Sequence, residues 1–172
     1  TARVSSVVFS PNGQWVAAGS DDKTIRIWHW NGSVLDYWLD LSGHTGEVMG
    51  IAVSPDGQQM VLLSSRDLFS VDMYLADVET GKVTRKLIST ALDPHFESIQ
   101  FIRSAGSWDA KGDKFVFGGV AKGRPELTIL DMKKEKVEKE IPFPELGEIL
   151  RPCWSPDGRY IAFSALAGGV TD

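Results

Sequence analysis

The ten residues WSPDGRYIAF, at positions 154–163, place a strand-forming run, a tight turn and a second strand-forming run in immediate succession. The same arrangement occurs at residues 8–18 as VFSPNGQWVAA and at residues 52–62 as AVSPDGQQMVL. A degenerate copy, SWDAKGDKFVF, lies at residues 107–117. Because β-branched and aromatic residues flank each turn, the sequence predicts four hairpins of one design.

Each full copy of the turn reads Ser-Pro-(Asn/Asp)-Gly. The Pro fixes φ, the Asn or Asp hydrogen-bonds to nearby backbone, and the Gly accepts a positive φ. In the degenerate copy, Ala110 and Lys111 replace the Pro and the Asp. The predicted turn residues are Pro11, Asn12, Gly13, Pro55, Asp56, Gly57, Gly112, Pro156, Asp157 and Gly158.

The spacing between the turns predicts the architecture. Counted at Pro11, Pro55, Ala110 and Pro156, the steps are 44, 55 and 46 residues. Two further strand-forming runs follow each of the first three hairpins, as in KTIRIWHW and VLDYWLDL. Four strands per unit and a period in the forties are typical of β-propeller blades. We therefore predict an all-β partial propeller of about three and a half four-stranded antiparallel blades.

The expected organisation is a single propeller-type domain over residues 1–172. Its blades cover about 3–42, 47–90 and 102–144, and a half blade covers about 147–172. The longer middle step leaves an insertion over about 91–101 that contains Asp93, His95 and Glu97. In an extended segment these three side chains would share one face, as metal ligands do, but a polar loop is the favoured interpretation.

Composition excludes several classes of partner. The net charge of −5 argues against a nucleic-acid surface, and no apolar run is long enough to insert into a membrane. Cys153 is the only cysteine, so no internal disulfide can form, and it is expected as a small apolar residue of a buried strand. Trp108, Trp154 and Phe9, each just before a turn, are expected to pack between blades; ligand stacking at the channel mouth is the alternative.

The first 50 residues resemble a WD repeat. VVFSPNGQWVAAGSDDKTIRIW follows the pattern of that family, and SGHTGEV at residues 42–48 carries its Gly-His pair. The resemblance implies a hydrogen-bonded tetrad of His, Ser or Thr, Asp and Trp. Ser20, Asp22 and Trp28 match it in the first blade without a His, and His44 matches it in the second without clear partners.

From about residue 52 the sequence resembles a TolB-like propeller, through its Ser-Pro-Asp-Gly turns and the ADVETGK segment. Two repeat types in one chain favour an engineered or recombined chimera, with a natural divergent propeller as the alternative. The WD resemblance implies a cytoplasmic location and an intracellular complex as partner. The TolB-like resemblance implies the periplasm and an envelope protein.

An arc of blades leaves two sheet faces and a strand edge uncovered. We therefore expect the chain to associate with itself, as a dimer that supplies about seven blades.

No catalytic constellation or cofactor motif stands out around His29, His44 and His95, so no cofactor or enzyme activity is expected. The expected function is a non-catalytic scaffold that presents a protein-interaction surface. The alternatives are an envelope-associated TolB-like binding module, or the propeller lobe of a hydrolase whose catalytic domain lies outside this chain.

Overall fold

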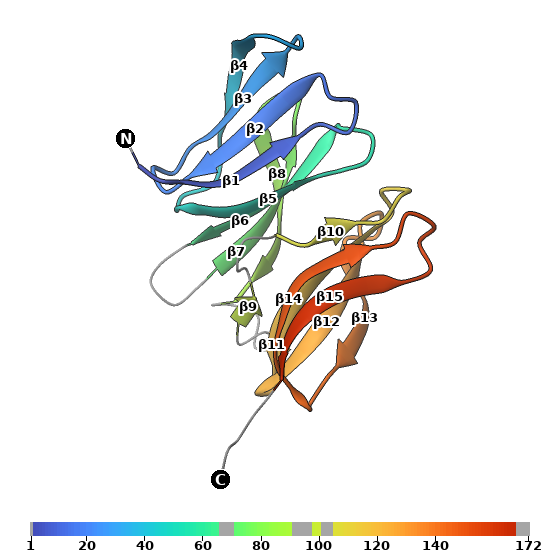
Figure 1. Cartoon of the computed structure of the whole chain (residues 1–172). Coiled ribbons are helices and arrows are strands. Elements are labelled where there is room, and N and C mark those ends of the chain that lie inside the picture. The colour runs from blue at the N-terminus through green and yellow to red at the C-terminus, as the bar shows by residue number, and fades with distance from the viewer. Residues whose placement is uncertain (1, 66–70, 91–97, 101–104, 168–172) are drawn as a thin grey trace.

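The computed structural model describes residues 2–65, 71–90, 98–100 and 105–167. Within these residues every regular element is a β-strand, and the strands form four antiparallel sheets. Figure 1 shows the sheets following one another from the blue N-terminal sheet to the red C-terminal one. The described part of the chain contains no helix long and apolar enough to cross a membrane.

The first two sheets each contain four strands in chain order. The first consists of β1 (Val4–Phe9), β2 (Trp15–Ser20), β3 (Ile25–Trp30) and β4 (Leu35–Leu41). The second consists of β5 (Val48–Val53), β6 (Gln59–Ser65), β7 (Val71–Asp77) and β8 (Lys82–Ser89).

The third sheet begins with an interrupted strand. Both β9 (Ser98–Gln100) and β10 (Ser107–Trp108) pair with β11 (Lys114–Ala121), and β12 (Arg124–Asp131) and β13 (Lys136–Pro142) complete the sheet. Ser98–Gln100, expected from the sequence to lie in an insertion over about 91–101, pair with β11 of the third sheet. Asp93, His95 and Glu97 lie outside the described residues. The fourth sheet contains β14 (Leu146–Trp154) and β15 (Ile161–Ala167).

The four repeated hairpins share one register. The residue before each turn pairs with the residue seven positions later: Phe9 with Val16, Val53 with Met60, Trp108 with Phe115, and Trp154 with Ile161. A one-residue slip would exchange the two faces of the sheet, so the common turn places the same repeat positions on the same face every time.

Three apolar clusters join consecutive sheets into a stack. Trp15, Ile25 and Ile27 of the first sheet meet Met60 and Leu62 of the second. Corresponding clusters join the second sheet to the third and the third to the fourth. The expectation of an all-β partial propeller is confirmed, and the described sheets form no closed ring.

Residues that lie side by side across the strands of each sheet form a row at the same repeat positions, which we call the packing row. In the second, third and fourth sheets this row contacts the preceding sheet. In the second sheet it contains Val53, Met60, Ala76 and Val83. In the third it contains Trp108, Phe115 and Leu130, with Val137 at the outer end, and in the fourth Trp154 and Ile161. In the first sheet it contains Phe9, Val16, Trp28 and Tyr37.

Two sequence-based expectations about packing were wrong. Phe9 is 56% exposed rather than buried, because no described sheet covers the packing row of the first sheet. Cys153 is exposed, because it lies in β14 of the fourth sheet and no described strand packs over it there.

Candidate functional site at the turn end of the stack

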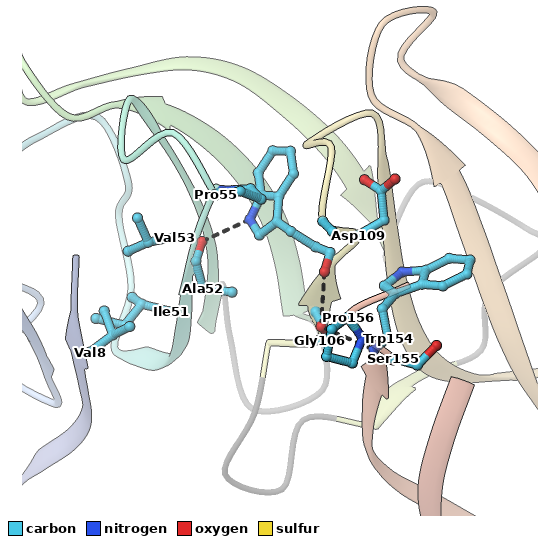
Figure 2. A pocket seen from close by; sticks show the side chains of 13 residues that line it. Val8, Ile51, Ala52, Val53, Pro55, Gly106, Asp109, Trp154, Ser155 and Pro156 are labelled. Carbon is cyan, nitrogen blue, oxygen red and sulfur yellow. Dashed lines mark hydrogen bonds between the residues drawn. The ribbon is translucent and has the colours of Figure 1, made fainter. Parts of the chain in front are cut away.

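One candidate site is a cavity of about 400 Å³ where the repeated turns of the last three sheets approach one another (Figure 2). Ile51, Ala52 and Val53 of β5 form one wall, with Pro55 in the turn that follows. Residues 106–110 and 154–156 form the other walls. The lining is therefore apolar and aromatic, with a few polar groups from the turns.

The regular turn is held by its Ser and its Asp together. Ser54 Oγ donates to Asp56 Oδ1 at 2.6 Å and accepts the backbone N–H of Gln59 at 2.9 Å. Gly57, with φ of 74°, donates its N–H to the Ser54 carbonyl at 2.9 Å. The hydrogen bond from Ser54 lowers the pKa of the Asp56 carboxyl, which stays ionised in the turn. The turns at Ser10 and Ser155 repeat these bonds.

The degenerate third turn reaches the same geometry by a different route. Asp109 stands where the other turns have Ser, and its Oδ1 accepts the backbone N–H groups of Asp113 and Lys114, both at 2.8 Å. Gly112 keeps the positive φ, at 72°. One carboxylate thus holds the turn although Lys111 stands in the position of the acid.

The turns are stacked, and the stack is interrupted at Ala110. A β-carbon at Gly57 would lie 3.9 Å from Cδ of Pro11, and one at Gly112 would lie 3.5 Å from Cδ of Pro55. At Gly158 no heavy atom would lie within 4 Å. Since Ala110 lacks the proline ring, a second cavity of about 330 Å³ separates the third and fourth turns.

The two tryptophans at equivalent repeat positions differ in their hydrogen bonding. The indole Nε1 of Trp108 donates to the backbone carbonyl of Ala52 in the preceding sheet at 3.1 Å. The indole Nε1 of Trp154 is buried and has no hydrogen-bond partner among the described residues. In Figure 2 the nitrogen edge of the Trp154 ring faces the middle of the view.

The tetrad-like residues lie near one turn without forming a complete tetrad in the described structure. Ser20 is buried, its Oγ accepts the Asp22 N–H at 3.2 Å, and a hydrogen bond from Thr24 lowers the pKa of Asp22. His44 reaches this turn from the loop before β5. Burial lowers the pKa of His44, and the nearby backbone of Lys23 opposes that shift in part.

Trp28 lies in the packing row of the first sheet, so its described contacts are with strand neighbours. The ring of His29, in β3, stacks on Trp38 with centroids 4.5 Å apart. Residues 2–65, 71–90, 98–100 and 105–167 contain no group of three or more His, Cys, Asp or Glu side chains that could hold a metal ion.

Sequence reasoning missed a buried polar cluster on β7 and β8. Asp72 is 1% exposed, and its Oδ2 accepts hydrogen bonds from Tyr74 Oη at 2.9 Å and Lys86 Nζ at 2.7 Å. Burial raises the pKa of Asp72, but the hydrogen bonds from Lys86 and Tyr74 and the charge of Lys86 outweigh it and lower the pKa overall. The feature of the sequence that indicates this cluster is Asp72, an acidic residue within the otherwise apolar run VDMYLA.

The fold and the stacked turns define an open segment of a β-propeller. Residues 1–29 and 38–72 match the family model described as WD domain, G-beta repeat. Among solved structures, the putative TolB of Agrobacterium tumefaciens superposes with a TM-score of 0.71 at 18% identity, covering 95% of this chain and 54% of that one. Hydrazine synthase of Kuenenia stuttgartiensis superposes with a TM-score of 0.73 at 15% sequence identity, covering 95% of this chain and 44% of that one. The family model confirms the resemblance to WD repeats, and the two superposed structures, one of them a putative TolB, confirm the propeller fold.

Two curated relatives align along almost the whole chain. Protein hir1 of Schizosaccharomyces pombe is 26% identical over 193 residues, which cover 99% of this chain and 19% of hir1. THO complex subunit 3 of Arabidopsis thaliana is 29% identical over 174 residues, covering 98% of this chain and 48% of that protein. The chain thus spans less than half the length of either relative.

Proposed function

We propose that this chain is a non-catalytic β-propeller scaffold that binds other proteins and associates with a second copy of itself. The observation that carries the proposal is the uncovered packing row of the first sheet. Phe9 is 56% exposed and Tyr37 is 61% exposed, whereas the equivalent Val53 and Val83 of the second sheet are partly buried against the apolar cluster between the first two sheets. At the other junctions the equivalent row is largely covered by the preceding sheet, with Val137 at the outer end of the third sheet still exposed, so the row of the first sheet is suited to receive another sheet.

The fourth sheet offers the complementary half of such a junction. Its face away from the third sheet carries Cys153 and Leu166, and Tyr160 stands at its turn; all three are exposed. Tyr160 occupies the repeat position of Trp15, which is buried between the first two sheets. A second copy could cover both exposed faces at once. The fourth sheet of each copy would pack on the first sheet of the other, in two equivalent head-to-tail contacts.

The binding role is supported by the relatives. One matching protein is named as a subunit of the THO complex, and others are named for ribosome biogenesis. By that likeness the partners would be members of an intracellular assembly, although the TolB-like fold keeps a periplasmic partner as the alternative. The packing of both described histidines, His29 on Trp38 and His44 in a blade-linking loop, supports a non-catalytic role.

The alignments also bear on the origin of the chain. A recombined chimera predicts that the two halves match separate families with a sharp junction near residue 50. A single protein, hir1, aligns with 99% of the chain, which favours one divergent propeller over a chimera.

The test is the solution mass, measured by light scattering coupled to size exclusion. The proposal expects twice 18.9 kDa for the parent chain. Phe9→Lys should shift the population to 18.9 kDa, because it places a charge in the junction. Val34→Lys, an equally exposed apolar position outside the packing row, should leave the dimer intact. A monomeric parent chain, or dimers unaffected by Phe9→Lys, would overturn the self-association.

A further inference from the structure

We propose that the gap between the third and fourth turns is a peptide-binding site. Its ligand is an extended segment of a partner protein that carries a proline next to an acidic residue. This inference rests on the proposed protein-binding function and specifies the chemistry of the partner. The gap and the adjoining cavity share Asp109, Ala110, Trp154 and Pro156 as lining residues, so the two lie side by side.

The first argument is the buried indole N–H of Trp154, which lacks an acceptor in the described structure. A buried donor without a partner destabilises a protein, so such groups commonly mark places where a ligand or water completes the bond. The chain contains its own template for the missing bond, because Trp108 donates to a backbone carbonyl from the same repeat position. A peptide carbonyl is therefore the matching acceptor for Trp154, and the proposed binding includes a turn of the ring that brings this buried N–H to the cavity.

The second argument is the vacancy left by Ala110. In the two preceding pairs of turns a proline ring, Pro11 or Pro55, lies against the glycine of the next turn. Between the third and fourth turns this ring is missing, and space is open above Gly158. A proline of the ligand fits this space by shape. An extended proline-containing segment also loses little conformational entropy when it binds beside tryptophan rings.

The third argument is charge. The other turns carry Asn12, Asp56 or Asp157 at this position, whereas the third turn carries the exposed Lys111. The other charged side chains that line the gap already have partners: Asp109 with backbone amides, Asp113 with Lys133, Lys114 with Glu138, and Asp157 with Arg159. Lys111 forms no ion pair with any described residue, so it is the cation available to an acidic side chain of the ligand.

The experiment follows the six indole N–H signals of the full ¹⁵N-labelled chain by NMR. The probe is the peptide acetyl-Gly-Pro-Glu-Pro-Glu-Pro-Gly-amide, and Trp154→Phe assigns the signal of interest. The proposal expects the Trp154 indole signal to move with saturation. Replacing the peptide prolines by alanine, or the glutamates by glutamine, should weaken binding by about fivefold or more, because each removes one contact.

Ala110→Pro is the decisive variant, because it fills the gap with the ring found in the other turns. It should raise the melting temperature, since Pro suits this position of the turn, and lower the peptide affinity by about tenfold or more. An Ala110→Pro variant that folds and binds like the parent would overturn the proposal. So would a Trp154 signal that stays still at millimolar peptide.

The result can be read separately from self-association, because the gap lies between the third and fourth turns, whereas the proposed junction uses the first sheet and the face of the fourth sheet that points away from the third. A dimer that ignores the peptide would refute the binding site and leave the scaffold proposal standing. A monomer that binds the peptide would support the binding site and overturn only the self-association.

Discussion

Replacing Asp109 by Ala tests whether one carboxylate holds the degenerate turn. The side chain is 8% exposed and accepts two backbone N–H groups at 2.8 Å each. Hydrogen bonds to charged groups stabilise a protein by about 1.5–3 kcal/mol each. Because Asp113 and Lys114 are half-buried and water can replace part of the loss, the lower value applies to both bonds. Asp109→Ala should therefore destabilise the chain by about 3 kcal/mol.

The assay is thermal and urea unfolding followed by tryptophan fluorescence. For a chain of this size, about 3 kcal/mol corresponds to a fall in melting temperature of roughly 6–12 °C. Asp109→Ser is the matched control, because Ser10 Oγ accepts the two equivalent N–H groups at 3.0 Å each in the first turn. The Ser variant should lose less than about 1 kcal/mol. Equal losses for Ala and Ser, or none for Ala, would refute this account of the turn.

Three further predictions concern the junctions between sheets. Gly19→Ala would place a β-carbon 2.5 Å from Cγ1 of Val48, so we expect a loss of about 1–3 kcal/mol by urea unfolding; an unchanged midpoint would contradict such close packing. Burial lowers the pKa of His44 below 6.5, so the unfolded chain binds its proton first as the pH falls. Stability should therefore fall below pH of about 6.5, and His44→Gln should flatten that dependence; a parallel curve would exclude His44 as its source. Lys86→Met leaves the buried Asp72 carboxylate without its cation. Because Lys86 is 38% exposed, we expect the free energy of unfolding at pH 7 to fall by about 2–3 kcal/mol. An unchanged free energy of unfolding would mean that Tyr74 alone satisfies the carboxylate.

The strands and turns could be predicted from the sequence because their causes are local. The Ser-Pro-(Asn/Asp)-Gly turns fix three of the hairpins locally, and the strands β1 and β2 flank the first of these turns as the stretch at residues 8–18 predicts. It was harder to predict which sheet faces are covered by a neighbouring sheet. Phe9 and Trp108 stand at the same repeat position, but only Trp108 has a preceding sheet to cover it.

The candidate site could be predicted only in part. The sequence shows that Ala110 and Lys111 depart from the repeat, but not that Asp109 compensates for them. Nor does it show that Trp154 lacks the acceptor that Trp108 has, because that difference depends on how two adjacent sheets meet. The Asp72 cluster likewise depends on the pairing of β7 with β8, which brings Lys86 to the carboxylate.

The packing row makes each sheet depend on its immediate neighbours and on little else. Such a chain behaves as a one-dimensional array, whose stability is approximately a sum over sheets and junctions. Hydrogen exchange should then be slowest in the second and third sheets, each held from both sides, and fastest in the two-stranded fourth sheet. Blades joined by one repeated junction can also be added or lost without redesign of the others, so gene duplication could change the length of such an array in single steps.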